Sequence, residues 1–291
     1  MKIAMSGASG FIGSRLSQFL SHEGHEIVPL GRELFRPENE MPLCRILSTC
    51  RAVVNLAGAP IDKRWTRTYK QQLIDSRVEV TRCLTKAMKK ASPSPAILVS
   101  ASAVGYYPEW GEWDEYNDVY GNDFLAHLCR EWEGAARECP EGTRLIITRF
   151  GIVLSRDGGA LPPLLNIQRR LHAGVVIGNG QQPFPWISLP DLCRAYSLLL
   201  RDDRLSGVFN FTVPCNITQR ELARDLAYTE HIDRLVPIPR LFFRILYGER
   251  SHFITNGQWV SPTRLQEAGF IFHHPTPKSL LKGAASPVGE K

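Results

Sequence analysis

The sequence lacks several features that define particular classes of protein. It has no apolar run long enough to span a bilayer and no leader pattern of charged and then apolar residues. Its seven cysteines are an odd number without a Cys-x-x-Cys pair, which argues against disulfides and metal binding. The net charge of +6 is scattered and forms no basic stripe with interleaved aromatics. We therefore expect a cytoplasmic protein that binds no metal, membrane or nucleic acid.

Length and charge indicate how many domains the chain forms and what kind of ligand suits it. A chain of 291 residues buries a sizeable core and forms either one large domain or a domain with an attached lobe. Its composition is ordinary for a globular protein. The mild excess of cations suits a phosphorylated ligand.

Three glycines near the start of the chain are the most informative feature. They are spaced three apart, between an apolar strand at Ile3–Met5 and an amphipathic run that begins at Phe11. A helix N-terminus offers unpaired N–H groups and a partial positive charge, and glycines let a pyrophosphate approach them. The pattern predicts a dinucleotide site, with a purely structural turn between strand and helix as the alternative. The predicted binding residues of this turn are Gly7, Ser9, Gly10, Phe11, Ile12 and Gly13.

Strand and helix patterns alternate through the first half of the chain. A C-cap at Gly24 precedes the strand expected at Glu26–Leu30, and a polar, proline-containing stretch then runs from 31 to 50. Such alternation predicts a doubly wound parallel α/β sheet, with ligands beyond the carboxyl ends of its strands. The further expected strands are 52–56, 97–100 and 145–150, and the expected helices are 69–90 and 123–138.

The second half is less regular, which suggests a smaller mixed α/β lobe. We expect a dinucleotide-binding domain at 1–155, with strand and helix contributions from 186–212, and a substrate lobe at 156–282. Residues 283–291 are expected to be disordered. The expected helices of this half are 161–171, 190–201, 218–226 and 241–247, and the expected short strands are 175–177, 185–188 and 208–211.

The end of the second strand indicates which dinucleotide binds. An NAD site carries an acid here to bond the ribose 2′-hydroxyl, whereas this chain has Arg32 followed by Glu33. An arginine forks onto a 2′-phosphate, so the pattern predicts NADP(H) rather than NAD(H). The alternative is that Arg32 is a solvated loop residue.

Several further motifs identify a resemblance that covers nearly the whole chain. They are similar to the extended short-chain dehydrogenase/reductases, and more narrowly to the atypical, epimerase-family branch related to nucleoside-diphosphate-sugar epimerases. The resemblance implies a Rossmann-type fold, and it adds Leu56, Ala57, Gly58 and Ser100 to the cofactor-binding candidates, although Ser100 also fits a buried strand position. The motifs that carry it are Ser6–Gly13, Asn55–Gly58, Arg64–Thr66, Asp75–Arg77, Ser100–Tyr107, Arg130–Glu133, Asp157–Leu161, Trp186–Ser188, Gly257–Gln258 and Leu265–Phe270.

The resemblance fails at the residues that move a proton. Superfamily enzymes pair a serine with a Tyr-x-x-x-Lys on the next helix. Ser102 matches the serine, but when Glu133 is aligned to an acid common on that helix, Leu125 and Cys129 take the places of the tyrosine and lysine. Neither residue can do that chemistry, and Cys129 is expected to pack inward.

Substitutes can be named for the missing pair. Tyr106 and Tyr107 follow Ser102 closely and are candidate catalytic phenols, with aromatic packing or substrate stacking as the alternative. Lys63 or Arg64 would then supply the charge that such a phenol needs. The remaining candidates are His127, which also suits a structural role, and Trp65 and Trp186 as pocket walls or core residues.

Two functions remain open from the sequence. The first is an NADP-dependent oxidoreductase or epimerase acting on a small polar, sugar-like substrate. The second is a non-catalytic NADP(H)-binding redox sensor or regulatory protein, which the missing tyrosine and lysine favour. In the superfamily, homodimers often form through the helices expected here at 69–90 and 123–138.

Overall fold

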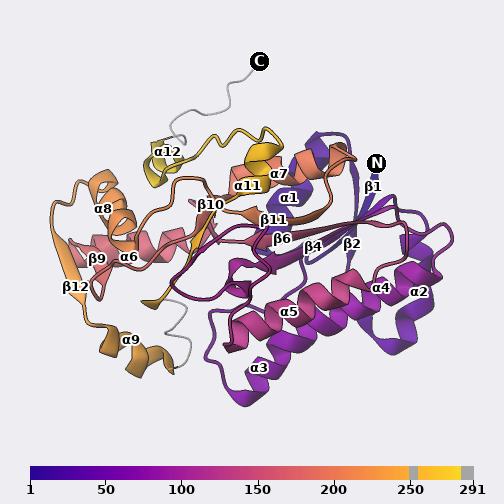
Figure 1. Cartoon of the computed structure of the whole chain (residues 1–291), viewed down its shortest axis with the longest axis horizontal. Coiled ribbons are helices and arrows are strands. Elements are labelled where there is room, and N and C mark those ends of the chain that lie inside the picture. The colour runs from indigo at the N-terminus through magenta and orange to yellow at the C-terminus, as the bar shows by residue number, and fades with distance from the viewer. Residues whose placement is uncertain (249–254, 283–291) are drawn as a thin grey trace. The chain divides into compact units, whose positions relative to one another are not determined.

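The computed structural model describes residues 1–248 and 255–282 (Figure 1). The chain divides into two compact units, and each is described by itself. The first unit comprises residues 1–106, 119–149 and 193–209. The second comprises residues 107–118, 150–192 and those from 210 onward.

A six-stranded sheet forms the centre of the first unit. Its order is β11-β6-β4-β3-β1-β2, and the pairs among β1 to β4 are parallel. Ser6 is level with Asn55, and Asn55 with Ser100, so the carboxyl ends of β1, β3 and β4 form one edge. The strands are β1 Lys2–Ser6, β2 Glu26–Leu30, β3 Ala52–Asn55, β4 Ile97–Ala103, β6 Arg144–Phe150 and β11 Gly207–Phe211. The predicted α/β fold with a parallel sheet is confirmed.

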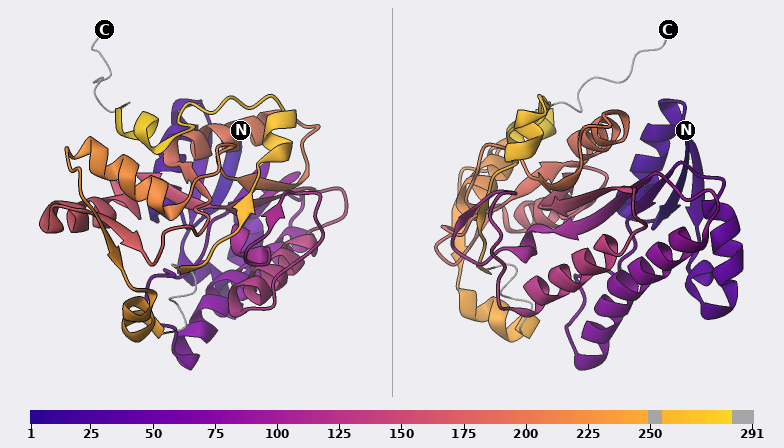
Figure 2. Two further views of the ribbon diagram at one scale, coloured as in Figure 1. Left: turned by 60° about the vertical axis from the view of Figure 1, so that its left-hand side comes forward. Right: turned by 45° about the vertical axis from the view of Figure 1, so that its right-hand side comes forward.

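Helices cover both faces of this sheet. In Figures 1 and 2, α1 and α7 lie on one face and α4 and α5 on the other. The helices are α1 Phe11–His22, α2 Glu40–Leu47, α3 Arg67–Ile74, α4 Val80–Lys90, α5 Phe124–Arg137 and α7 Leu189–Arg201, and the short 3-10 turns are η1 Arg32–Phe35, η2 Pro37–Asn39 and η4 Val104–Tyr106. Gly24 ends α1 at a φ of +82°, as predicted.

Two features of the first unit depart from the sequence prediction. The sequence pattern predicts no helix or strand from 31 to 50, yet this stretch contains α2 in addition to the turns η1 and η2. The helix expected at 69–90 is interrupted by a π-helical turn, η3 Asp75–Glu79, between α3 and α4. Such turns insert an extra residue into a helix and change the direction in which its side chains point.

The second unit is built from short elements around an apolar cluster. Trp186 and Leu154 are fully buried in it, packed against leucines of α6 and α8. Thr218 and Glu221 form a capping box at the start of α8. The elements are β5 Glu112–Trp113, β7 Ile152–Ser155, β8 Gly158–Gly159, α6 Leu161–Leu171, β9 Gly174–Ile177, β10 Trp186–Ser188, α8 Gln219–Thr229, β12 Leu235–Ile238, α9 Arg240–Tyr247, β13 Trp259–Val260, α11 Thr263–Glu267 and α12 Pro277–Lys282.

One buried carboxylate holds the C-terminal part of the second unit. Asp191 is fully buried and accepts hydrogen bonds from the backbone N–H groups of His273 and His274, at 2.9 and 2.8 Å. The hydroxyl of Ser188 donates a further bond to it at 3.0 Å. The tail predicted to be disordered, 283–291, lies outside the described residues.

Candidate active site

The glycine turn after β1 packs so tightly that side chains would not fit. Gly7 has a φ of +68°, and a methyl group on it would lie 2.6 Å from the carbonyl oxygen of Leu56. A methyl group on Gly13 would lie 2.1 Å from the carbonyl oxygen of Gly7. Gly10 is the N-cap of α1 and no side chain caps the helix, which leaves its first amides available to a ligand.

A second turn, formed by Leu56 to Gly58, lies against the first. The contact between Gly7 and Leu56 joins the two turns at the carboxyl edge of the sheet. Ser100 lies beneath them, 1% exposed, and its hydroxyl accepts a bond from the Asn55 amide at 3.3 Å. The same Asn55 binds Ser6 at 2.6 Å and Thr81 at 2.7 Å. Ser100 therefore belongs to a buried network that supports the turns from below.

The residues after β2 place two opposite charges at the same edge. Arg32 is exposed and forms no ion pair within residues 1–248 and 255–282. The carboxylate of Glu33 folds back over Gly31, so closely that a methyl group on Gly31 would lie 2.0 Å from Glu33 Oε1. The strand end thus carries a cation that has no ion pair among the described residues and, directly after it, the carboxylate of Glu33.

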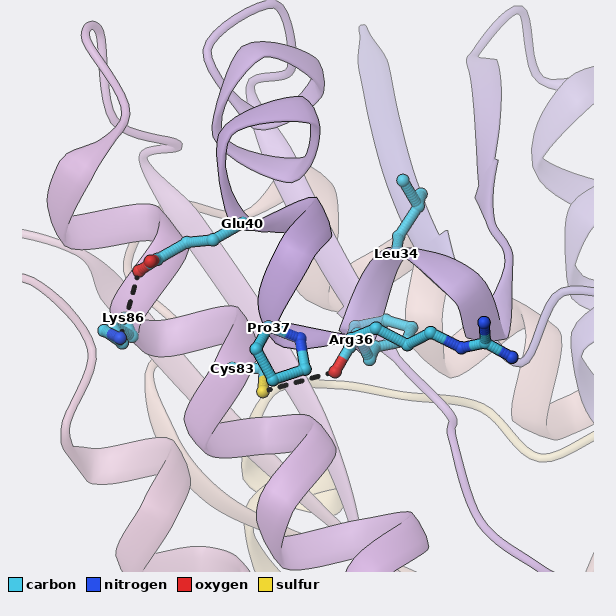
Figure 3. Close-up of a pocket in the computed structure, with 7 residues that line it drawn as sticks. Leu34, Arg36, Pro37, Glu40, Cys83 and Lys86 are labelled. Atoms are coloured by element: carbon cyan, nitrogen blue, oxygen red, sulfur yellow. Dashed lines mark hydrogen bonds and ion pairs between the residues drawn. The ribbon is translucent and has the colours of Figure 1, made fainter.

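A cavity of about 160 Å³ opens beside these residues, between η1, α2 and α4 (Figure 3). Figure 3 shows the ion pair of Glu40 and Lys86 at one end and the Arg36 side chain at the other. Sites for small molecules typically enclose about 300–1,000 Å³, so this cavity is too small for a dinucleotide.

Ser102 is part of a buried ionic cluster. Its hydroxyl donates to Glu133 Oε1 at 2.8 Å, and Arg149 binds both oxygens of the same carboxylate, at 2.7 and 2.9 Å. The Arg149 guanidinium also lies 3.5 Å from the ring centroid of Tyr106. Ser102 and Glu133 are 2% and 1% exposed. The cluster therefore joins β4, α5 and β6 through one carboxylate.

The two candidate tyrosines have different environments. Tyr106 belongs to the first unit and packs under Arg149. Tyr107 belongs to the second, where its hydroxyl lies 2.8 Å from the carbonyl of Asp114 and 3.0 Å from the Asn210 amide oxygen. Its ring stacks on Trp113. These contacts suit a structural role for Tyr107.

The places of the missing pair hold residues without acid–base chemistry. Leu125 is apolar, and burial raises the pKa of the Cys129 thiol to about 12. Cys129 is therefore a neutral, packed thiol at physiological pH.

The other candidates have ordinary surroundings. His127 is exposed, Trp65 packs edge-on against Phe124, and Lys63 lies over the Tyr69 ring. Trp186 is a core residue of the second unit.

Sequence reasoning missed the role of two charged residues. The family resemblance gives Glu133 only as an acid common on this helix, although an acid on the same helix face as Trp132 and Ala136 signals a buried partner. Arg149 gives a similar signal, because it interrupts an apolar strand. In the described part of the chain, no group of three or more His, Cys, Asp or Glu residues is placed to hold a metal ion. Within the same ranges, none of the helices combines the length and apolar character needed to cross a bilayer.

Comparison with known proteins decides the family. Residues 3–211 match the model of the NAD dependent epimerase/dehydratase family. The chain belongs to this family. Residues 238–284 match a second model, described as a domain of unknown function (DUF1731).

Relatives of this family align along nearly the whole chain. A protein of Arabidopsis thaliana named epimerase family protein SDR39U1 homolog, chloroplastic, is 36% identical over 97% of this chain and 86% of its own. The crystal structure of human epimerase family protein SDR39U1 (isoform 2) with NADPH is 34% identical, with a TM-score of 0.89 over 98% of this chain and 99% of that one. A nucleoside-diphosphate sugar epimerase from Corynebacterium glutamicum, 26% identical, has a TM-score of 0.77 over 97% of this chain and 57% of its own. The resemblance stated from the motifs is thereby confirmed.

Proposed function

We propose that this epimerase-family protein binds NADP(H) and uses it in an oxidoreductase or epimerase-type reaction on a small polar, sugar-like substrate. The observation that carries the proposal is the glycine turn, where Gly7 and Gly13 permit the close backbone approach that a pyrophosphate needs. The human relative whose structure contains NADPH supports the choice of cofactor.

The charges after β2 support NADP(H) over NAD(H). Arg32 is exposed, has no carboxylate partner in the described ranges and follows the strand end that faces the adenosine ribose in such sites. A 2′-phosphate would give it a partner through charge-assisted hydrogen bonds. Glu33 follows Arg32 directly, so its negative charge opposes the attraction of Arg32 for a phosphate.

The Arg32→Ala variant should bind NADPH about tenfold or more weakly than the wild type, because it loses one charge-assisted contact. Its affinity for NADH should change little. Titration calorimetry with NADPH, NADP⁺, NADH and NAD⁺ measures both effects. Arg51→Ala is the matched control, since Arg51 is exposed and lies at the opposite edge of the sheet. Equal NADPH affinity in wild type and Arg32→Ala would refute the selectivity, and no binding of any dinucleotide would refute the cofactor site.

The proposed chemistry at Ser102 follows from the direction of its hydrogen bond. NADP(H), when bound, supplies or accepts a hydride at its nicotinamide ring. The Ser102 proton is directed at Glu133, so the Ser102 oxygen presents lone pairs and accepts a bond from a substrate hydroxyl. As that hydroxyl is oxidised, its proton passes to Ser102 and the serine proton to Glu133; reduction reverses both transfers.

The Ser102→Ala variant should lose turnover by about a hundredfold, which is the usual contribution of one positioned proton-transfer group. Its NADPH affinity should stay that of the wild type. The assay follows NADPH oxidation with a panel of aldehydes, ketones and sugar nucleotides, and calorimetry supplies the binding constant. Ser94→Ala, at an exposed serine of the same unit, is the control. Turnover that survives in Ser102→Ala would remove Ser102 from the reaction.

A second candidate function is a non-catalytic NADP(H)-binding protein. The specific observation behind it is that Leu125 and Cys129 replace the tyrosine and lysine, while the Tyr107 hydroxyl is already bonded within the second unit. Tight NADPH binding without turnover of any substrate in the panel would favour this function.

A further inference from the structure

Arg77 is a partly buried cation that no carboxylate of the described residues neutralises. Its guanidinium donates to the carbonyls of Ala59 at 3.0 Å and Leu73 at 3.4 Å, and to the Ser76 hydroxyl at 3.4 Å. All three partners are neutral, and Arg77 forms no ion pair with any acid in the described ranges. By contrast, Arg149 in the same unit is paired with Glu133.

Among the described residues, two of the five N–H donors of Arg77 have no acceptor. A guanidinium carries five donors, and the bonds to Ala59, Leu73 and Ser76 use one each. Burial lowers the pKa of the Arg77 guanidinium, but an arginine stays charged in proteins. A partly desolvated charge with spare donors is costly unless an anion or a polar ligand group meets it.

Arg77 lies next to the glycine turns. A methyl group on Gly58 would come within 2.9 Å of the Arg77 Cζ atom, and the turn that contains Gly58 touches Gly7 through Leu56. The two turns and the guanidinium are therefore successive neighbours in the first unit. A dinucleotide held by the glycine turn would lie at the same edge of the sheet.

Arg77 also reaches the part of α5 from which the lysine is missing. The π-helical turn that carries Arg77 packs against α5, and the guanidinium lies 5.4 Å from the Trp132 ring centroid. It is close enough to Cys129, three residues earlier on α5, to act on the pKa of that thiol. Cys129 occupies the place that the family resemblance gives to the lysine. The Arg77 guanidinium therefore brings a positive charge close to the position on α5 where the family has its lysine and this chain has Cys129.

We infer that Arg77 replaces the missing lysine as the cation that holds the nicotinamide half of the bound dinucleotide. The inference rests on the proposed function, because it presupposes that NADP(H) binds. Arg77 is assigned a binding and positioning role, through its two remaining N–H donors and its charge.

The test compares two ligands, NADPH and 2′,5′-ADP, which contains the adenine half alone. In Arg77→Gln, NADPH affinity measured by calorimetry should fall about tenfold or more, as for one charge-assisted contact. The affinity for 2′,5′-ADP should stay within about twofold, because that ligand lacks the nicotinamide half. Arg82→Gln is the control, on the same helical segment but exposed and paired with Glu79.

Each other outcome has a separate meaning. Unchanged NADPH affinity in Arg77→Gln overturns the inference and leaves the proposed function intact. Equal losses for both ligands also overturn it, because they indicate that the Leu56–Gly58 turn was disturbed. If the wild type binds neither ligand, the proposed function itself fails.

Arg77→Lys keeps the test decisive if Arg77→Gln does not fold. It retains the charge but has a single nitrogen in place of the fork. A loss of NADPH affinity that spares 2′,5′-ADP supports the inference, and wild-type affinity for both ligands contradicts it.

Discussion

Replacing Gly13 with alanine should abolish dinucleotide binding. The added methyl group would lie 2.1 Å from the carbonyl oxygen of Gly7 and 2.9 Å from the Ala8 Cα, and both of these are backbone atoms that cannot rotate away. The glycine turn must open, so the first amides of α1 no longer converge on one phosphate. NADPH affinity should fall below detection in calorimetry. Thermal unfolding of the same variant should also show lost stability, of about 1–3 kcal/mol for such overpacking.

The matched control for Gly13→Ala is Gly134→Ala. Gly134 also lies in a helix, α5, but a methyl group on it would meet nothing within 4 Å. Alanine favours a helix over glycine by about 0.8–1 kcal/mol, so this variant should be as stable as the wild type or more stable. Wild-type NADPH affinity in Gly13→Ala would show that the turn is not the binding site.

The Glu133→Gln variant should be strongly destabilised. Glu133 balances Arg149, which is itself only 3% exposed, and a glutamine would turn one N–H₂ group toward the arginine donors. Removing one partner of a buried ion pair costs about 3–5 kcal/mol, because the other charge is left uncompensated. Urea unfolding of variant and wild type measures this difference in the free energy of unfolding.

Glu131→Gln provides the comparison for Glu133→Gln. Glu131 lies on the same helix but is exposed, and surface substitutions of this kind usually change stability by less than about 0.5 kcal/mol. A similarly small effect of Glu133→Gln would mean that the cluster around Arg149 contributes little to folding. The importance of Glu133 would then be limited to Ser102, whose proton it orients and, in the proposed reaction, accepts.

Local signals explain how well the elements were predicted. The strand Glu26–Leu30 and the helix Leu161–Leu171 match the structure at both ends, because glycine or proline marks their boundaries. Helix α2 was missed because Pro42 suggests a break. Pro42 lies in the first turn of α2, where the helix needs no N–H from it. The π-helical turn at Asp75–Glu79 places the buried Leu73 and Val78 five residues apart, a spacing that a continuous α-helix over 69–90 does not allow for.

The candidate site likewise contains some residues that the sequence predicts and others that it does not. The glycine turn is a contiguous motif, so its position and close packing could be anticipated from thirteen residues. The cluster of Ser102, Glu133 and Arg149 joins three elements that the chain visits in turn, and no spacing rule connects them. Arg77 and Cys129 come from different helical segments. The sequence therefore indicates that the lysine is missing, but not that Arg77 lies near the position where it is missing.

The hydrogen bond from the His273 amide to Asp191 determines which parts of the protein can fold first during synthesis. After Asp191 leaves the peptidyl transferase centre, the ribosome must add 82 residues before the amide of His273 exists. Until then this carboxylate needs water in place of its two backbone donors. The second unit can therefore reach its final packing only when translation of this region is nearly complete, whereas the glycine turn is among the first parts to emerge.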